Sequence, residues 1–298
     1  MPSRQEIDQE IAALGSPFDI VRRKYAKQLQ EHTGRNVFIY AMKPPHGAIW
    51  NDDVQGFMAA QHQLSGADLD LIIHSTGGSS EAAEQIVSYL RQKYDHIRVI
   101  VPLYAMSAAT MIACAADEIV MGRQSALGPV DPQFLTPSGP MPAHAIVDEF
   151  ERALDQIRND PKTAAFWVPK LSVLQHGYFS VAKTVIERAE SLCREWLNSY
   201  MKLAPEKATD IAQWLASKEH GSHGKPIAVA DAEARGLKIS RLEHDQVLQD
   251  MVLSVFHCTM LTLERTPCAK FVENHLGKGF FQMQLPGIPQ IQAQPPTK

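Results

Sequence analysis

The sequence predicts an α/β fold built from strand–turn–helix units. Two apolar runs, residues 71–73 and 99–101, have the length of buried strands, and each is followed by a turn and a segment of helical character. Short buried strands that alternate with helices are typical of a sheet covered by helices. With 298 residues, of which 45% are hydrophobic and 21% charged, the chain is long enough to bury a full core.

The first of these units ends in a glycine pair. Gly77 and Gly78 interrupt the strand, and residues 79–81 supply N-cap serines and a first-turn acid for a helix that runs to about residue 93. Glycine permits positive φ and a close approach of the backbone to a ligand. Free N–H groups at such a turn, beside a helix N-terminus, can hold a developing oxyanion. The alternative is an ordinary strand–turn–helix corner.

The second unit places a lone serine among small residues. Pro102 cannot donate to a sheet, so the strand ends near it, and Ser107 then begins an apolar run that we expect to be a buried helix. The neighbours of Ser107 are too small to obstruct an approaching carbonyl. The N–H of Ala108 would be a second oxyanion donor, because the amide after a nucleophile often has that role. Alternatively, Ser107 only caps the helix.

These motifs carry a resemblance to a known family. The turn STGG at 75–78, the stretch AMSAATMIACAADEIVMG at 105–122, SALGPVDPQ at 125–133 and SHGKPIAVADAEARGL at 222–237 resemble the ClpP/crotonase superfamily of serine peptidases. Within it, the chain is most similar to the signal-peptide peptidase A-like branch called serine dehydrogenase proteinase. The resemblance implies a ClpP/crotonase-like β/α superhelical spiral core with added helices. It also implies that the protein is a hydrolase, a serine-type endopeptidase.

The same resemblance implies the roles of individual residues. Ser107 would be the nucleophile, with the N–H groups of Gly78 and Ala108 as the oxyanion hole. Where ClpP carries its histidine base this chain has Asp131, and His223 lies beside the place of the ClpP aspartate. Histidine and aspartate are thus exchanged, an order that the serine dehydrogenase proteinase branch is thought to use. Such an exchange is acceptable because a triad depends on geometry and not on chain order.

Other assignments of the base stay open at this stage. Asp131 precedes a proline and could simply organise a turn, and His223 lies in a loop where a histidine could be a solvated surface group. Signal-peptide peptidase A uses a Ser–Lys dyad, in which a desolvated lysine is the base. Resemblance to that enzyme makes Lys162 the alternative base, with Lys170 as a second candidate.

Three further functions also stay open. A crotonase-type acyl-CoA enzyme would use the paired N–H groups to hold a thioester oxyanion, although no adenine-nucleotide pocket can be identified from the sequence. A catalytically inactive oligomeric scaffold would keep the fold without a working base, and a membrane-associated peptidase would be recruited by a partner. For the peptidase, the resemblance implies a homo-oligomer that acts on peptides or unfolded protein segments. Its chemistry requires no metal and no organic cofactor.

Composition narrows the class of protein. The net charge of −4 and the scattered Lys and Arg residues give no basic footprint for nucleic acid. The four cysteines lie at spacings unlike a disulfide framework and fit a reducing compartment, so we expect a cytoplasmic location. His257, Cys258, Cys268 and His275 lack a metal-binding spacing, and we expect them to be buried or incidental.

The remaining segments define the expected boundaries. Residues 1–34 predict an N-terminal helical extension, an amphipathic helix broken near residues 15–17, with no signal peptide and no hydrophobic stretch long enough to span a membrane. Peripheral membrane association is not excluded by this pattern. Residues 35–265 are the expected peptidase domain, almost wholly helical over 143–217 and again over 245–265. Residues 266–298 are expected to be a C-terminal extension with a disordered tail rich in proline and glutamine.

Overall fold

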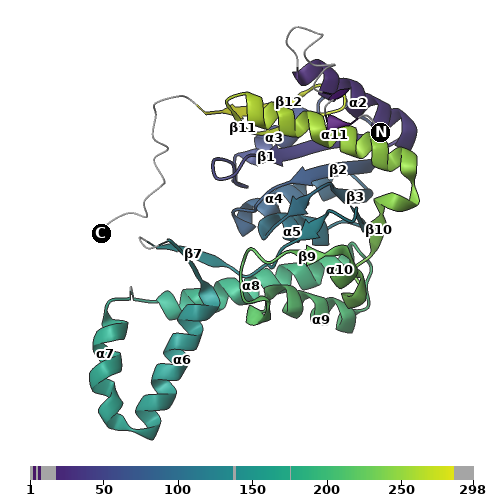
Figure 1. Ribbon diagram of the computed structural model, residues 1–298. Coiled ribbons are helices and arrows are strands. Elements are labelled where there is room, and N and C mark those ends of the chain that lie inside the picture. Colours follow the sequence, from purple (N-terminus) through teal and green to yellow (C-terminus); the bar gives the residue numbers. More distant parts are fainter. Residues whose placement is uncertain (1–2, 5, 8–17, 137–138, 175, 285–298) are drawn as a thin grey trace.

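A mixed sheet forms the centre of the protein, as seen in the computed structural model, which describes residues 3–4, 6–7, 18–136, 139–174 and 176–284. Within these residues the largest sheet has seven strands in the order β10-β5-β3-β2-β1-β11-β12 (Figure 1). The strands are β1 Asn36–Met42, β2 Asp68–His74, β3 His96–Val101, β5 Glu118–Met121, β10 Ile239–Arg241, β11 Cys268–Asn274 and β12 Gly279–Met283. The neighbouring strands β1, β2, β3, β5 and β10 pair in parallel, whereas β11 is antiparallel to both β1 and β12.

Helices cover both faces of this sheet. The helices of the described residues are α2 Phe18–Thr33, α3 Asp53–Ala60, α4 Ser80–Arg91, α5 Ala108–Cys114, α6 Ala143–Asn159, α7 Ala164–Ser172, α8 Tyr178–Ser199, α9 Pro205–Ala216, α10 Val229–Arg235 and α11 Gln246–Arg265. Helices α2 and α11 pack on each other over one face, and α3, α4 and α5 lie over the other (Figure 1). Alternate side chains of β1 therefore enter two different cores: Phe38 and Tyr40 join the larger, Val37 and Ile39 the smaller. Double coverage explains why residues 71–73 of β2 and 99–101 of β3 are continuous apolar runs instead of alternating ones.

Two small sheets lie beside the central one and bring distant loops together. One contains β4 Tyr104–Ala105, β6 Ala126–Leu127 and β9 Ile227–Ala228, and the other is the hairpin of β7 Gln133–Thr136 and β8 Gly139–Pro142. Strand β6 is parallel to β4 and antiparallel to β9. The chain just before Ser107, the chain just before Asp131 and the chain just after His223 are therefore neighbours.

The sheet extends past the expected end of the peptidase domain. The domain expected from the sequence ends at residue 265, whereas β11 and β12 come after this residue and complete the central sheet. Strand β11 pairs with β1 along its length, so β1 is not left as an open edge. The expected helices over 143–217 and 245–265 are confirmed as α6 to α9 and α11. The expected break near residues 15–17 and the expected disordered tail lie outside the described residues.

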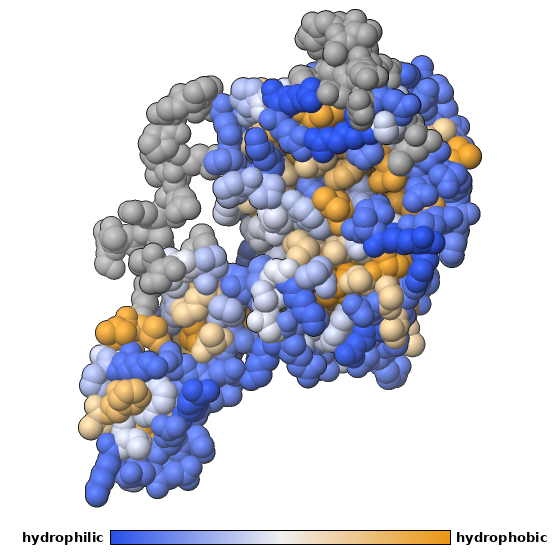
Figure 2. Space-filling view, viewed as in Figure 1, coloured by the Kyte–Doolittle hydropathy of each residue, from blue (hydrophilic) through white to orange (hydrophobic). Residues whose placement is uncertain are grey.

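Helices α6 and α7 form an arm that projects from the body of the molecule (Figure 1). They are joined by the short 3-10 helix Pro161–Thr163 at the far end of the arm, and α7 packs mainly on α6. Phe166, Val168 and Val173 of this arm are exposed, and Figure 2 shows hydrophobic residues on its surface. Along the described stretches, no helix combines the length and the apolar character that crossing a bilayer requires.

His74, the last residue of β2, is buried without polar partners. Its ring packs on Tyr104, with centroids 4.1 Å apart, and on Phe256 at 5.2 Å. Only 1% of His74 is exposed, and neither ring nitrogen has a hydrogen-bond partner among the described residues. Burial lowers the pKa of the imidazole to about 4. The folded protein therefore holds His74 neutral at pH values where an unfolded chain would protonate it.

We expect His74 to make folding stability depend on pH. As the pH falls from the unfolded value of about 6.5 toward about 4, the unfolded state binds a proton that the folded state does not. Between about pH 7 and about pH 5 this removes roughly 2 kcal/mol of unfolding free energy. Urea unfolding at the two pH values measures the loss, which should be smaller in His74→Leu and unchanged in the exposed control His62→Ala. Equal losses in all three proteins would contradict the assignment.

Candidate active site

Ser107 lies on the turn between β4 and α5. Its backbone has φ 53° and ψ −120°, a conformation that L side chains rarely adopt. Such a conformation costs about 1–3 kcal/mol and persists only where the surrounding structure enforces it. A strained serine between a strand and a helix is typical of a nucleophile elbow, which presents the hydroxyl to substrate. Ser107 lines a cavity of about 740 Å³, to which the predicted site residues Gly78, Ala108 and His223 also contribute.

The glycine turn is held between two other segments. On one side, Ile49 N–H donates to the carbonyl oxygen of Gly77 at 2.9 Å, and Ser79 N–H donates to the carbonyl oxygen of Ile49 at 2.9 Å. On the other side, Met106 N–H donates to Ser75 O at 3.0 Å, and Met106 directly precedes Ser107. The turn leaves no room for a side chain, because a Cβ on Gly77 would lie 2.7 Å from Cβ of Ser107. This close packing fixes the glycine backbone against the serine.

Two amides border the serine in the arrangement of an oxyanion hole. Gly78 has φ +154°, and its N–H donates none of the hydrogen bonds recorded in the described part of the chain. Ala108 is the first residue of α5, so its N–H has no partner inside the helix. Both residues line the cavity with Ser107. Preorganised amide donors at such a position stabilise the negative charge that develops during acyl transfer.

His223 lines the same cavity and forms a hydrogen-bonded pair with Asp131, which lines an adjoining pocket of about 200 Å³ together with His223. The distance from Nδ1 of His223 to Oδ1 of Asp131 is 2.7 Å. The Asp131 side chain is 10% exposed, whereas the His223 side chain is 32% exposed and contributes to the cavity wall. An Nδ1–H that donates to a carboxylate leaves Nε2 as the acceptor of the imidazole. Among the described residues no hydrogen bond joins His223 to Ser107, and such contacts often tighten only when substrate binds.

Gln133 is a second hydrogen-bond partner of Asp131 and was not among the site residues expected from the sequence. Its Nε2 donates to Oδ2 of Asp131 at 2.7 Å, so the two carboxylate oxygens have different partners, Gln133 and His223. Gln133 begins β7, two residues after Asp131, and also lines the cavity. Gln133 is the last residue of the stretch SALGPVDPQ that carries the family resemblance, but the sequence pattern assigned it no role.

We expect Gln133→Leu to slow the reaction of Ser107. Loss of a hydrogen bond to the carboxylate leaves Asp131 less well oriented, which should reduce the rate by about tenfold. The second-order rate of labelling by a fluorophosphonate probe measures this effect without knowledge of the natural substrate. The exposed Gln213→Leu is the matched control. An unchanged rate in Gln133→Leu would show that Asp131 needs no second partner.

The structure does not bring either candidate lysine to the cavity. Lys162 is exposed in the 3-10 helix at the far end of the arm (Figure 1). Lys170 forms an ion pair with Glu149, and its ammonium group lies 5.0 Å from the ring centroid of Trp167. Neither lysine has the burial that would favour a neutral amine.

A buried ion pair supports the segment that flanks Gly78. The ammonium group of Lys270 lies 2.6 Å from Oδ1 of Asp53 and donates to the carbonyl oxygen of Ala48 at 2.8 Å. The other oxygen of Asp53 accepts from the hydroxyl of Tyr40 at 2.5 Å and from Trp50 N–H at 2.9 Å. Burial, followed by the charge of Asp53, raises the pKa of Tyr40 well above its usual value. This network holds Ile49, which lies between Ala48 and Trp50, against the glycine turn.

The rest of the cavity wall is mainly apolar. Met111, Val130, Phe134, Val185 and Ala189 line it, together with the exposed ring of Trp50. Among the described residues, no group of three histidine, cysteine, aspartate or glutamate side chains is placed to hold a metal ion. The groups present at the site that suit acyl transfer are a hydroxyl, a His–Asp pair and two backbone amides.

These features are those of a ClpP-like serine hydrolase site. Residues 51–261 match the family model described as ClpP-like SDH-type serine proteinase. The chain belongs to this family, and the resemblance stated from the sequence is confirmed.

Two relatives are uncharacterized proteins of Methanocaldococcus jannaschii. One is 32% identical over 172 residues, which cover 58% of this chain and 52% of the relative. The other is 34% identical over 186 residues, which cover 62% of this chain and 58% of the relative. The match thus spans little more than half the length of these relatives.

Solved structures of low similarity include two proteases. The 1510-N membrane-bound stomatin-specific protease has a TM-score of 0.43 and 15% identity, covering 73% of this chain and 84% of that chain. ClpP1 from Listeria monocytogenes has a TM-score of 0.41 and 14% identity, covering 70% of this chain and 94% of that chain.

Proposed function

We propose that the protein is a serine endopeptidase in which Ser107 is the nucleophile, His223 the general base and Asp131 the residue that orients the imidazole. The observation that carries this proposal is the 2.7 Å hydrogen bond between His223 and Asp131 at the wall of the cavity that Ser107 lines. Membership of a serine proteinase family supports the reaction class. The N–H groups of Gly78 and Ala108 hold the oxyanion.

The reaction then proceeds in two halves. Oγ of Ser107 attacks the scissile carbonyl carbon while Nε2 of His223 takes the hydroxyl proton, and the carbonyl oxygen becomes an oxyanion held by the two amides. As the C–N bond breaks, His223 returns this proton to the leaving amine. In the second half, Nε2 of His223 takes a proton from water while the water oxygen attacks the acyl carbon. The bond from this carbon to Oγ of Ser107 then breaks, His223 returns the proton to Oγ, and the carboxylic acid product leaves. Asp131 stays ionised throughout and stabilises the imidazolium.

Fluorophosphonate labelling of single variants tests the choice of base. We expect His223→Ala to reduce the labelling rate of Ser107 by about a thousandfold, because the serine hydroxyl loses its proton acceptor. Asp131→Asn should reduce it strongly too, whereas Lys162→Ala should label like the wild type. Loss of labelling in Lys162→Ala with survival in His223→Ala would instead make the protein a Ser–Lys enzyme. A wild-type protein that binds coenzyme A and never labels would favour the crotonase-type reaction.

We also propose that the peptidase is a cytoplasmic homo-oligomer that acts on peptides or unfolded protein segments. The exposed apolar residues of the α6–α7 arm, Phe166, Val168 and Val173, support association, since contiguous exposed apolar surface is typical of interfaces. Light scattering should give a mass that is a multiple of the 33.1 kDa chain. A particle of monomer mass at all concentrations would contradict the oligomer.

A further inference from the structure

His223 lies in a loop that has few contacts with the rest of the protein. The loop joins α9 to β9, and beyond the 3-10 helix Lys218–His220 it has no regular secondary structure before β9 begins. Within the described part of the chain, the backbone groups of residues 221–225 form hydrogen bonds only to groups of the same loop. Backbone of this kind has many accessible conformations, and fixing one of them costs entropy. The position of His223 therefore depends on side chains that anchor the loop.

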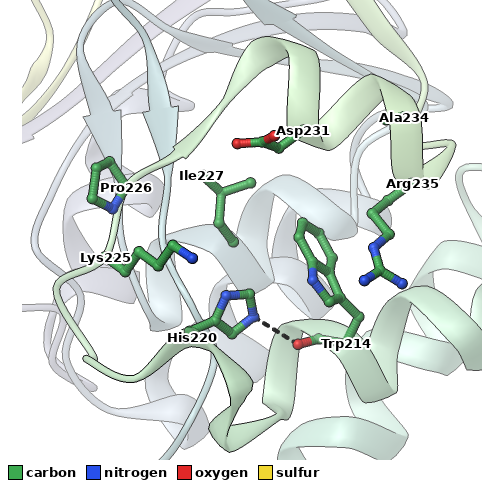
Figure 3. A pocket seen from close by; sticks show the side chains of 8 residues that line it. All are labelled: Trp214, His220, Lys225, Pro226, Ile227, Asp231, Ala234 and Arg235. Atoms are coloured by element: carbon green, nitrogen blue, oxygen red, sulfur yellow. Dashed lines mark hydrogen bonds between the residues drawn. The ribbon is translucent and has the colours of Figure 1, made fainter.

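His220 is the buried anchor of this loop. Only 9% of it is exposed, and its Nε2 donates to the backbone oxygen of Trp214, in the last turn of α9, at 2.7 Å (Figure 3). The ring centroids of His220 and Trp214 lie 5.2 Å apart. The ion pair of Lys218 with Asp148 also ties the loop, but these side chains are 63% and 41% exposed, so water and salt screen it. The hydrogen bond of His220 is therefore the contact that fixes the start of the loop.

The same turn of α9 holds the segment of Asp131. Val130, which directly precedes Asp131, donates its N–H to the carbonyl oxygen of Leu215 at 2.8 Å. The next carbonyl, that of Ala216, accepts from Nε2 of His144 at 2.7 Å. Carbonyl groups in the last turn of a helix have no partner inside the helix, so they are free to accept from other segments. Both members of the pair formed by His223 and Asp131 are thus anchored to one turn of α9.

His220 also separates two cavities. One has a volume of about 200 Å³ and is lined by His220 together with Asp131 and His223. The other has a volume of about 290 Å³ and is lined by His220 together with Trp214 and Ile227 (Figure 3). A closely packed side chain resists displacement because its neighbours fill the space around it. The loop has open space on both sides of His220, so close packing does not replace the anchor once it is removed.

We propose that His220 is a positioning residue that holds the loop on α9 so that His223 meets Asp131. His223 follows His220 by three residues, so the anchor limits where the imidazole can lie. The hydrogen bond between His223 and Asp131 measures 2.7 Å, and a displacement of about 1 Å breaks such a bond. A catalytic group misplaced by this distance can lose about 10²-fold in rate. The effect on catalysis rests on the proposed function; the effect on the pair of His223 and Asp131 does not.

The labelling rate of Ser107 tests the effect on catalysis. We expect His220→Leu to react about 10- to 100-fold more slowly with a fluorophosphonate probe than the wild type does. His220→Gln should restore most of the rate, because its side-chain amide keeps an N–H donor for the carbonyl of Trp214. Glu219→Gln is the matched control, since Glu219 is exposed at the adjacent position. A wild-type rate in His220→Leu, or equal losses in His220→Leu and His220→Gln, would overturn the role.

The tautomer of His223 tests the pair without catalysis. Imidazole nitrogen shifts in Ser107→Ala with isotope-labelled histidine distinguish Nδ1–H from Nε2–H at about pH 8.5, where ordinary imidazole is neutral. We expect Nδ1–H at His223, as donation to Asp131 requires, and a shift toward Nε2–H when His220→Leu is added but not when His220→Gln is added.

Two outcomes of the tautomer measurement decide the proposal. The signal of His223 is assigned by its loss in His223→Ala, and a tautomer that stays unchanged in His220→Leu would overturn the role of His220. If Ser107 never labels, the proposed function fails, and the tautomer of His223 still decides whether His220 positions the pair.

Discussion

Ser107→Ala should lose all measurable peptidase activity and all fluorophosphonate labelling while keeping its fold. In the proposed mechanism Oγ of Ser107 forms the acyl-enzyme, and removal of a catalytic serine reduces kcat by about 10³- to 10⁶-fold. Alanine at this position meets the same positive φ as the serine, which has φ 53°, so the backbone strain does not change. We therefore expect an unchanged thermal unfolding midpoint.

A matched control uses a second serine of the same cavity. Ser80 also lines the cavity, and its hydroxyl donates to Glu81 instead of facing the His–Asp pair. Ser80→Ala should label at close to the wild-type rate. Labelling that survives in Ser107→Ala and maps by mass spectrometry to another residue would remove Ser107 from the mechanism.

Gly78→Ala should abolish most of the activity by displacing the oxyanion donor. A Cβ at this position would lie 2.4 Å from both N and O of Ile49, which are backbone atoms held by the glycine turn and by the Asp53–Lys270 network. The turn must shift to relieve this clash, and loss of one oxyanion donor costs about 10²- to 10³-fold in kcat. We also expect a lower unfolding midpoint, because the backbone conformation at φ +154° disfavours alanine.

Gly34→Ala separates the clash from backbone strain. Gly34 has φ +68°, and a Cβ there would meet nothing within 4 Å. Gly34→Ala should therefore lose some stability but retain full labelling of Ser107. If Gly78→Ala labels at the wild-type rate, the N–H of Gly78 is not an oxyanion donor.

The sequence made the local parts of the site predictable. Gly78, Ser107 and Ala108 belong to short strand–turn–helix motifs, in which the residue types themselves indicate the backbone conformation. The contact between His223 and Asp131 depends on the pairing of β6 with β9, which no local pattern reveals. The roles assigned to these residues stay predictions until the variants are measured.

The last two strands could not be predicted for a different reason. Strand β11 contains Lys270, Glu273 and Asn274, so it lacks the apolar character that marks a buried strand, yet all seven of its residues are buried. Each polar side chain has a distant partner: Lys270 pairs with Asp53, Glu273 accepts from Arg22, and Asn274 donates to Ala60 O. A polar residue is tolerated in a core when its partner is present, and the partner is invisible in the local sequence.

The Lys270–Asp53 contact makes the support of the glycine turn depend on a strand that is synthesised late. Strand β1 and Asp53 leave the ribosome early, but their partner β11 follows only after α11 has been made. Until then β1 lacks its antiparallel neighbour, Asp53 lacks its counter-ion, and Ala48 lacks the donor that restrains the segment beside Gly78. A nascent chain that already contains the residues proposed for catalysis, Ser107, Asp131 and His223, therefore still lacks the contacts by which β11 supports the glycine turn.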